Sequence, residues 1–294
     1  MARHFLIGDE LGGEELTALI ERALELKAAP MLSSALERRT AALLFELSST
    51  RTRTSMEAGV VELGGHPMVL RSAELQLARG ESVRDTALVL SRHAALIGLR
   101  TGSDALLAEL ADHATVPVVN LLSPAHHPCQ ALADLLTLRE AFGRLEGLRL
   151  AYVGDGNNVA RSLAVVGALA GVEVAIASPT GYELDRATVP EATILTSDPQ
   201  EAVAGAHAVY TDVWVSMNDD EATAAARRHA LAGYRLDDAL LDAAGEGAIA
   251  LHCLPAHPGE EITADVLYGG RQRIWDQAEN RRHAQKALIE TLVG

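Results

Sequence analysis

The stretch "FELSSTRTRTSMEAGVVELGG" (residues 45–65) joins an apolar run to a helix-period segment through a series of hydroxyl residues and two arginines. The residues at 48–50 are types that cap helix N-termini, and the glycines at 64 and 65 are typical of a helix end. We therefore predict a strand over 40–47 that leads into a capped helix. Its free N–H groups, its dipole and the arginines suit an anion such as phosphate. An ordinary capped helix with exposed arginines explains this stretch equally well.

Strand-like runs alternate with helix-period segments in both halves of the chain, which is typical of parallel sheets covered by helices. The expected strands are residues 40–47, 67–70, 95–100 and 116–121 in the first half, and 148–154, 172–178, 206–214 and 247–255 in the second. Residues 129–143, between the halves, have the spacing of an amphipathic helix. The fold class we predict is α/β, with two domains, each a mostly parallel sheet flanked by helices, joined by interdomain helices.

The composition narrows the range of partners. The 294 residues are 48% hydrophobic and 22% charged, with a net charge of -15. This charge argues against a nucleic-acid or anionic-membrane partner, and any anionic ligand must be held by local positive charge. No apolar run approaches the length of a membrane span, and two cysteines are too few for a disulfide framework. We therefore expect a cytoplasmic enzyme with no nucleic-acid and no membrane partner.

Polar residues follow two further expected strands. In "SPAHHPCQALADLLT" (123–137), His127 and Gln130 lie one helical turn apart, so both side chains can face one ligand. A capping or core role is the alternative for His127. In "YTDVWVSMNDD" (210–220), Asp212 ends an expected strand, where α/β sheets bind ligands, although a solvated loop has the same pattern.

Two stretches resemble cofactor sites but do not fit them. The histidines and the cysteine of "LHCLPAHPGEEIT" (251–263) lack a convincing zinc spacing, so we expect no metal. "GDGNN" (154–158) looks like a dinucleotide loop, but Val159 stands where G-x-G-x-x-G has its third glycine. The next expected strand ends on Ser178 and not on an acid that binds a ribose. A nicotinamide-dependent dehydrogenase is therefore the weaker interpretation.

Four motifs, taken together and in this order, resemble those of the aspartate/ornithine carbamoyltransferase family, most closely its ornithine-specific members. They are Ser49-Thr50-Arg51-Thr52-Arg53, His127-Pro128-Cys129-Gln130, Asp212-Val213-Trp214-Val215-Ser216-Met217 and His252-Cys253-Leu254-Pro255. The resemblance covers nearly the whole chain. It implies transfer of the carbamoyl group of carbamoyl phosphate to the side-chain amine of L-ornithine, giving L-citrulline and phosphate, with no metal or organic cofactor.

The resemblance also implies that the two domains bind different substrates. Residues 1–138, completed by a C-terminal helix at about 276–294, would bind carbamoyl phosphate, residues 139–275 would bind ornithine, and the reaction would take place in the cleft between them. The implied carbamoyl-phosphate-binding residues are Ser49, Thr50, Arg51, Thr52, Gln76, Arg100, His127, Gln130, Cys253, Leu254 and Arg281. The implied ornithine-binding residues are Asn158, Asp212, Ser216 and Met217. The implied catalytic residues are Arg51, Arg100, His127, Gln130, Asp212, Cys253 and Arg281.

In this scheme the phosphate is neutralised by the helix start and Arg100. His127, Gln130 and Arg100 polarise the carbamoyl carbonyl, in the sense of an oxyanion hole. The attacking amine must be neutral although a free alkylamine has a pKa of about 10.4, so the site must bind or generate the minor form. Asp212 and Cys253 would orient it.

Three positions depart from the family pattern. Leu47 stands in place of a usual lysine, Asn218 in place of a usual glycine, and Pro258 where arginine or a similar residue is often found. The change at Asn218 leaves the amine less certain, so relatives specific for putrescine, lysine or acylornithine stay as alternatives, as does a non-catalytic ligand-sensing member of the fold. An aspartate-specific enzyme is disfavoured because that relative carries a different strand end in place of His-Cys-Leu-Pro.

The segment "ELQLARGES" (74–82) resembles the family segment that reaches into a neighbouring subunit, with Gln76 as the visiting residue. A plain polar loop is the alternative. The resemblance therefore predicts a homotrimer or a multiple of trimers.

Overall fold

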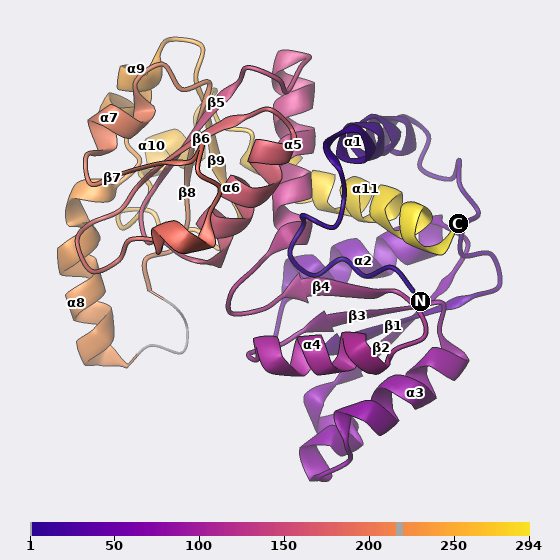
Figure 1. The fold of residues 1–294 in the computed structure, drawn as a ribbon. Coiled ribbons are helices and arrows are strands. Elements are labelled where there is room, and N and C mark those ends of the chain that lie inside the picture. Colours follow the sequence, from indigo (N-terminus) through magenta and orange to yellow (C-terminus); the bar gives the residue numbers. More distant parts are fainter. Residues whose placement is uncertain (1, 216–219) are drawn as a thin grey trace. The chain divides into compact units, whose positions relative to one another are not determined.

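A computed structural model describes residues 2–215 and 220–294 and divides the chain into two compact units (Figure 1). Unit 1 comprises Met1–Leu136 and Glu279–Gly294, and unit 2 comprises Thr137–Ala278. Both divisions between the units fall inside helices, namely α5 (Pro128–Phe142) and α11 (Ile274–Val293). Unit 1 is therefore built from two pieces of chain that are far apart in sequence.

Unit 1 contains a four-stranded sheet in the order β2-β1-β3-β4. Its strands are β1 (Thr40–Phe45), β2 (His66–Arg71), β3 (Leu96–Arg100) and β4 (Val118–Leu122). The other elements are α1 (Gly13–Ala28), α2 (Thr50–Glu62), η1 (Ser72–Glu74), η2 (Gln76–Arg79), α3 (Val83–His93) and α4 (Asp104–His113). The strands pair in parallel, as expected where helical crossovers return the chain to the same edge.

Alternate strand residues of unit 1 form a core under α3 and α4. Ala42 and Leu44 of β1, together with Ile97 and Leu99 of β3, are buried in one cluster with apolar residues of these helices. Figure 1 shows α2 on the other face of the sheet. Because both faces are covered, β1 is a continuous apolar run without alternation.

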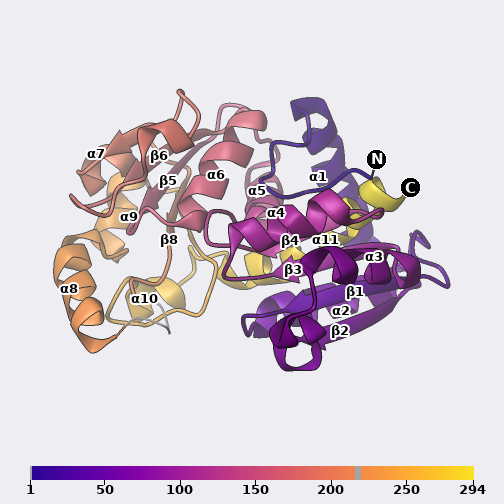
Figure 2. The ribbon, with the colours of Figure 1, turned by 60° about the horizontal axis from the view of Figure 1, so that its bottom comes forward.

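Unit 2 contains a five-stranded sheet in the order β7-β6-β5-β8-β9, again with parallel pairing. Its strands are β5 (Arg149–Val153), β6 (Glu173–Ala177), β7 (Ile194–Thr196), β8 (Ala208–Thr211) and β9 (Ile249–His252). The other elements are α6 (Asn158–Leu169), η3 (Arg186–Thr188), α7 (Pro199–Val203), α8 (Glu221–Leu231), η4 (Ala232–Tyr234), α9 (Asp238–Ala244) and α10 (Ala264–Leu267). Helices α7 and α9 share a core with one face of the sheet, and Figure 2 shows α6 on the other side.

The predicted fold class is confirmed, since each unit is a parallel sheet flanked by helices. The eight predicted strands are all present, and β7 is an additional short strand that was not predicted. The helix predicted over 129–143 is α5, but the expectation that it is amphipathic was wrong, because residues 127–138 are all buried. A helix that is buried on every side has no polar face to maintain. Within the described ranges, no helix combines the length and low charge that a membrane span needs.

Candidate functional site

Each sheet has one point where the strand order reverses direction, and α/β sheets leave a ligand crevice outside the strand ends at that point. In unit 1 the reversal lies between β1 and β3, and in unit 2 it lies between β5 and β8. Residues singled out from the sequence follow these strands and the next strand outward, which is β4 in unit 1 and β9 in unit 2. The topology therefore gives each unit its own candidate site.

The start of α2 has the capping geometry predicted from its sequence. Ser49 is the N-cap residue, and its Oγ accepts a hydrogen bond from the Thr52 N–H at 3.2 Å. Thr50 and Arg51 form the first turn, directly after the end of β1. An anion at this position meets the positive end of the helix dipole.

Thr52 lies in a buried hydrogen-bonded cluster that we call the Thr52 cluster, formed by Thr52, Arg100, Gln130, Asp134 and Arg281. Thr52 Oγ1 accepts from Arg281 Nη2 at 2.8 Å and lies 3.5 Å from Arg100 Nη1. Arg281 Nη1 donates to Gln130 Oε1 at 3.0 Å, and Gln130 Nε2 donates to Asp134 Oδ1 at 2.8 Å. Two guanidinium groups thus converge on one hydroxyl, an arrangement that suits a multiply charged anion.

His127 is buried close to the arginines of the same unit. Burial lowers its pKa well below 6.5, and repulsion from Arg281, Arg100 and Arg51 lowers the pKa further. The imidazole is therefore neutral at pH 7, with one ring nitrogen as a donor and the other as an acceptor. It can donate a hydrogen bond to a carbonyl oxygen without bringing a full charge.

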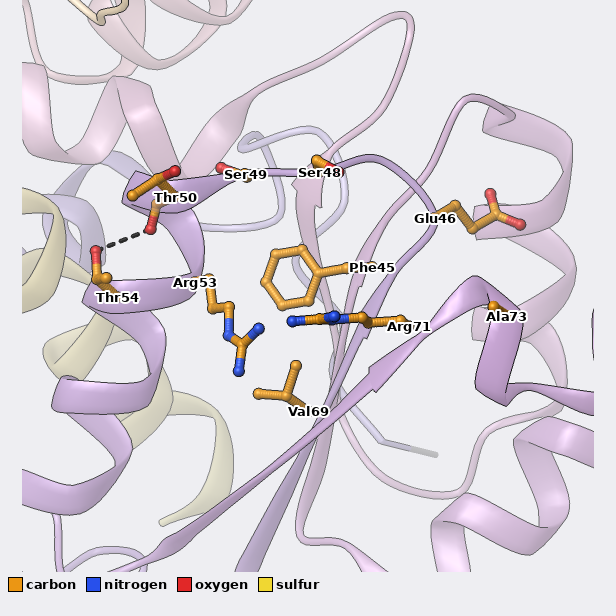
Figure 3. A pocket seen from close by; sticks show the side chains of 10 residues that line it. All are labelled: Phe45, Glu46, Ser48, Ser49, Thr50, Arg53, Thr54, Val69, Arg71 and Ala73. Atoms are coloured by element: carbon orange, nitrogen blue, oxygen red, sulfur yellow. Dashed lines mark hydrogen bonds between the residues drawn. The ribbon is translucent and has the colours of Figure 1, made fainter.

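A pocket of about 550 Å³ lies beside the start of α2 (Figure 3). It is lined by Phe45, Glu46, Ser48, Ser49, Thr50, Arg53, Thr54, Val69, Arg71 and Ala73. Figure 3 shows the guanidinium groups of Arg53 and Arg71 next to the Phe45 ring, and Arg53 also pairs with Glu57 at 2.7 Å. The pocket shares only Ser49 and Thr50 with the predicted site, so it borders the Thr52 cluster and does not coincide with it.

Gln76, which was predicted to contribute to this site, lies in the exposed turn η2. In the part of the chain that the structure describes, no hydrogen bond or ion pair joins its side chain to the Thr52 cluster. The predicted role of Gln76 is in the site of a neighbouring subunit, so a single chain does not test it.

In unit 2, Asp212 directly follows β8 and is 6% exposed. Its Oδ2 accepts from Asn157 Nδ2 at 2.8 Å, while its Oδ1 accepts from the Val213 N–H at 2.8 Å and from the Cys253 thiol at 2.9 Å. All three partners are donors, which fits an ionised carboxylate. The strand order β5-β8-β9 explains why these segments meet, because Asn157 follows β5 and Cys253 follows β9.

Asn157 is a site residue that the sequence analysis missed. It is the N-cap of α6, and its Oδ1 accepts from the Val159 N–H at 2.9 Å and the Ala160 N–H at 3.1 Å. The analysis selected its neighbour Asn158, which is the half-buried first residue of α6. An asparagine before a helix was a visible indication, but it also marks any ordinary cap.

The loop that carries Asn157 is fixed on several sides. A Cβ atom on Gly156 would lie 2.6 Å from the Tyr182 carbonyl oxygen and 2.6 Å from the Leu184 nitrogen, so only glycine fits without a backbone shift. Asp155 forms an ion pair with Arg227, whose Nε also donates to the Trp214 carbonyl at 2.7 Å. These contacts hold the loop against the segment that follows β8.

Asp212, His252 and Cys253 present possible metal-ligand atoms within 4.8 Å of one another. His252 Nδ1, however, accepts from the Leu254 N–H at 2.8 Å, and its Nε2 lies 3.2 Å from Glu261 Oε1. A ring nitrogen that accepts carries no proton, so Nε2 donates to Glu261. A metal would displace one of these bonds, and the arrangement does not fit a metal site.

Leu254 adopts the left-handed backbone region, with φ of 63°. This region is uncommon for residues other than glycine, and such residues concentrate at functional sites. The bond from its N–H to His252 stabilises the conformation. Ser216 and Met217, predicted to bind ornithine, and the unusual Asn218 lie outside the described residues.

Two family models together match nearly the whole chain. Residues 3–140 match "Aspartate/ornithine carbamoyltransferase, carbamoyl-P binding domain", and residues 146–292 match "Aspartate/ornithine carbamoyltransferase, Asp/Orn binding domain". The chain is 52% identical over 308 residues to the ornithine carbamoyltransferase of Acidothermus cellulolyticus, which covers 100% of this chain and 97% of that protein. It is 46% identical over 303 residues to that of Methanoculleus marisnigri, with 100% and 97% covered.

Solved structures give the same relationship. Ornithine carbamoyltransferase from Thermus thermophilus is 44% identical, with all of both chains covered and a TM-score of 0.93. That from Pyrococcus furiosus is 41% identical and covers 98% of this chain and 96% of its own, with a TM-score of 0.92. An N-acetyl-L-ornithine transcarbamylase is 29% identical, covers 98% of this chain and 99% of its own, and has a TM-score of 0.86.

Proposed function

The chain belongs to the aspartate/ornithine carbamoyltransferase family, and on that premise we propose that it transfers the carbamoyl group of carbamoyl phosphate to the side-chain amine of L-ornithine. The products are L-citrulline and phosphate. The observation that carries the choice of amino acid is the buried Asp212 carboxylate of unit 2. A fixed negative charge attracts a cationic amino acid and repels a dicarboxylate such as aspartate. Full-length similarity to proteins named ornithine carbamoyltransferase supports the same choice.

Carbamoyl phosphate binds at the start of α2 in unit 1. The backbone N–H groups and hydroxyls of residues 49–52 surround the phosphate, while Arg51, Arg100 and Arg281 neutralise it. This assignment is supported by the convergence of Arg100 and Arg281 on Thr52 Oγ1. As the bond to the carbamoyl carbon breaks, charge grows on the leaving phosphate, and the guanidinium groups stabilise it.

His127, Gln130 and Arg100 polarise the carbamoyl carbonyl. The neutral state of His127 supports this role, because a neutral N–H donor stabilises a developing oxyanion without competing for the phosphate. One N–H of Gln130 is used by Asp134, which leaves the second N–H of that amide for the carbonyl oxygen.

The amine is bound in unit 2. Asp212, Asn158, Ser216 and the Met217 backbone bind the amino acid, and Cys253 with the Leu254 carbonyl contacts the reacting groups. The Cys253 thiol donates to Asp212 Oδ1, which supports a role for the pair in orienting the amine. Phosphate is a good leaving group once its charge is neutralised, so we propose that the reaction uses no metal or organic cofactor.

A colorimetric assay for ureido products tests the proposed function. L-Ornithine, L-lysine, putrescine, N-acetyl-L-ornithine and L-aspartate are each incubated with the protein and carbamoyl phosphate, and the variant Asp212→Asn serves as a control of the same shape. We expect citrulline with ornithine and a large loss in the variant. Product from another amine alone would favour a relative of different specificity, and no product from any amine would favour a ligand-sensing role.

We also propose that the protein forms a homotrimer, or a multiple of trimers, in which Gln76 enters the site of a neighbouring subunit. The exposed position of η2 supports this proposal. Light scattering on the active protein tests it, and a fully active monomer would contradict it. The proposed compartment is the cytoplasm, in keeping with two cysteines that are both free.

A further inference from the structure

We propose that Asn157 is a positioning residue of the amine site, which fixes the Asp212 carboxylate in one orientation. The inference rests on the proposed role of Asp212 in binding the amine. It goes further, because Asn157 contacts Asp212 and the helix α6 at the same time. Its side chain is therefore the link between a rigid element and the charged group of the site.

The orientation of the Asn157 amide is determined by its contacts. Its Oδ1 accepts from the N–H groups of Val159 and Ala160, at 2.9 and 3.1 Å. Reversing the amide would place its NH2 group against two N–H donors and lose both caps. The Nδ2 group therefore points permanently to Asp212 Oδ2, 2.8 Å away.

The remaining contacts of Asp212 show where an amine can bind. Oδ1 accepts from the Val213 N–H and the Cys253 thiol, so both of its lone-pair directions are used. Oδ2 accepts from Asn157 and has one direction left. An ammonium or amine group therefore meets Oδ2, the oxygen that Asn157 holds.

A neutral amide suits this task better than a cation would. A lysine or arginine at the same position would also hold the carboxylate, but it would cancel the charge that attracts the amine. The nearby Tyr152 is also neutral, because burial and then Asp212 raise its pKa well above 10. Arg227 is paired with Asp155 in the same loop, so its charge is partly compensated.

Two variants separate positioning from capping. Asn157→Ser keeps an oxygen that caps α6 and removes the donor to Asp212. We expect the KM for ornithine to rise about 10- to 100-fold, the usual effect of losing one hydrogen bond to a charged group, with little change in the KM for carbamoyl phosphate. Asp198→Ser is the matched control, because Asp198 caps α7 of the same unit through the Gln200 N–H at 2.9 Å. It should change neither constant.

Asn157→Asp adds a readout that a purely structural role would not move. Two carboxyl groups in contact share a proton at low pH, and the protonated one can then donate to the other. The ratio of variant to parent kcat/KM for ornithine should therefore fall as the pH rises. A ratio that is flat with pH, or an Asn157→Ser variant with the parental KM for ornithine, would overturn the inference. The pH ratio also serves if Asn157→Ser does not fold.

A thermal double-mutant cycle is independent of the reaction. Asn157→Ser and Asp212→Ala are melted singly and together, and the double variant should lose less melting temperature than the two single losses added. Strict additivity would refute the coupling. A parent protein that makes no citrulline but shows this coupling would sink the proposed function while leaving the Asn157 contact intact.

Discussion

Replacing Arg281 by methionine removes the guanidinium that joins Thr52 to Gln130 while keeping a long unbranched side chain. Arg281 donates to these two residues at 2.8 and 3.0 Å and is 3% exposed. A hydrogen bond to a charged group contributes about 1.5–3 kcal/mol. If both N–H groups turn to the phosphate in the transition state, the loss is about 3–6 kcal/mol. The kcat/KM for carbamoyl phosphate then falls about 10²- to 10⁴-fold.

The neighbouring Arg282 provides the matched control. It lies in the same helix and pairs with Glu62 at 3.2 Å and with Glu279 at 3.3 Å, outside the Thr52 cluster. Citrulline formation is measured over a range of carbamoyl phosphate at saturating ornithine, after melting curves show that both variants are folded. Arg282→Met should keep kcat/KM within about twofold, because partly exposed ion pairs contribute little. Parental kcat/KM in Arg281→Met would refute the assignment of Arg281 to the phosphate.

Acidification should destabilise unit 1 through His283, because burial, then Lys286 and Arg282, lower its pKa from 6.5 to about 4. The unfolded chain takes up the proton first, so this contribution to stability is present above pH 6.5 and is lost as the pH falls towards 4, by at most about 3 kcal/mol. Denaturant titration at both pH values should show a smaller loss in His283→Gln, and an equal loss would exclude His283 as the cause. Gly156→Ala should raise the KM for ornithine and lower the melting temperature, because its Cβ would lie 2.6 Å from backbone atoms. A parental KM would show that the loop adjusts without moving Asn157. Calorimetry should detect ornithine clearly only with an unreactive carbamoyl phosphate analogue present, and equal affinity without the analogue would contradict ordered binding.

Strand order and parallel pairing were largely predictable, because apolar runs bounded by turn residues recur along the chain. The strand β7 was missed because a three-residue edge strand of half-buried side chains has no periodic pattern. The burial of α5 was also missed. Periodicity indicates one apolar face but does not show how many neighbours cover a helix.

The site was predictable where residues bind ligands directly and follow strand ends. Residues that act through a partner were not. Asn157 contacts Asp212 across 55 positions, and only the strand order brings them together. Asp134 is different, because it lies four positions after Gln130 in one helix, and that spacing alone favours a side-chain pair.

The two-piece construction of unit 1 has a consequence for synthesis on the ribosome. About 140 residues of unit 2 separate its pieces, and at about 5–20 residues per second their translation takes on the order of 10–30 s. During that interval Glu62 lacks the ammonium group of Lys286, which lies 2.6 Å away in the finished protein. The nascent first piece therefore waits with an uncovered apolar surface and an unpaired acid. We expect it to engage chaperones, and fragments that stop before Arg281 to aggregate without binding carbamoyl phosphate.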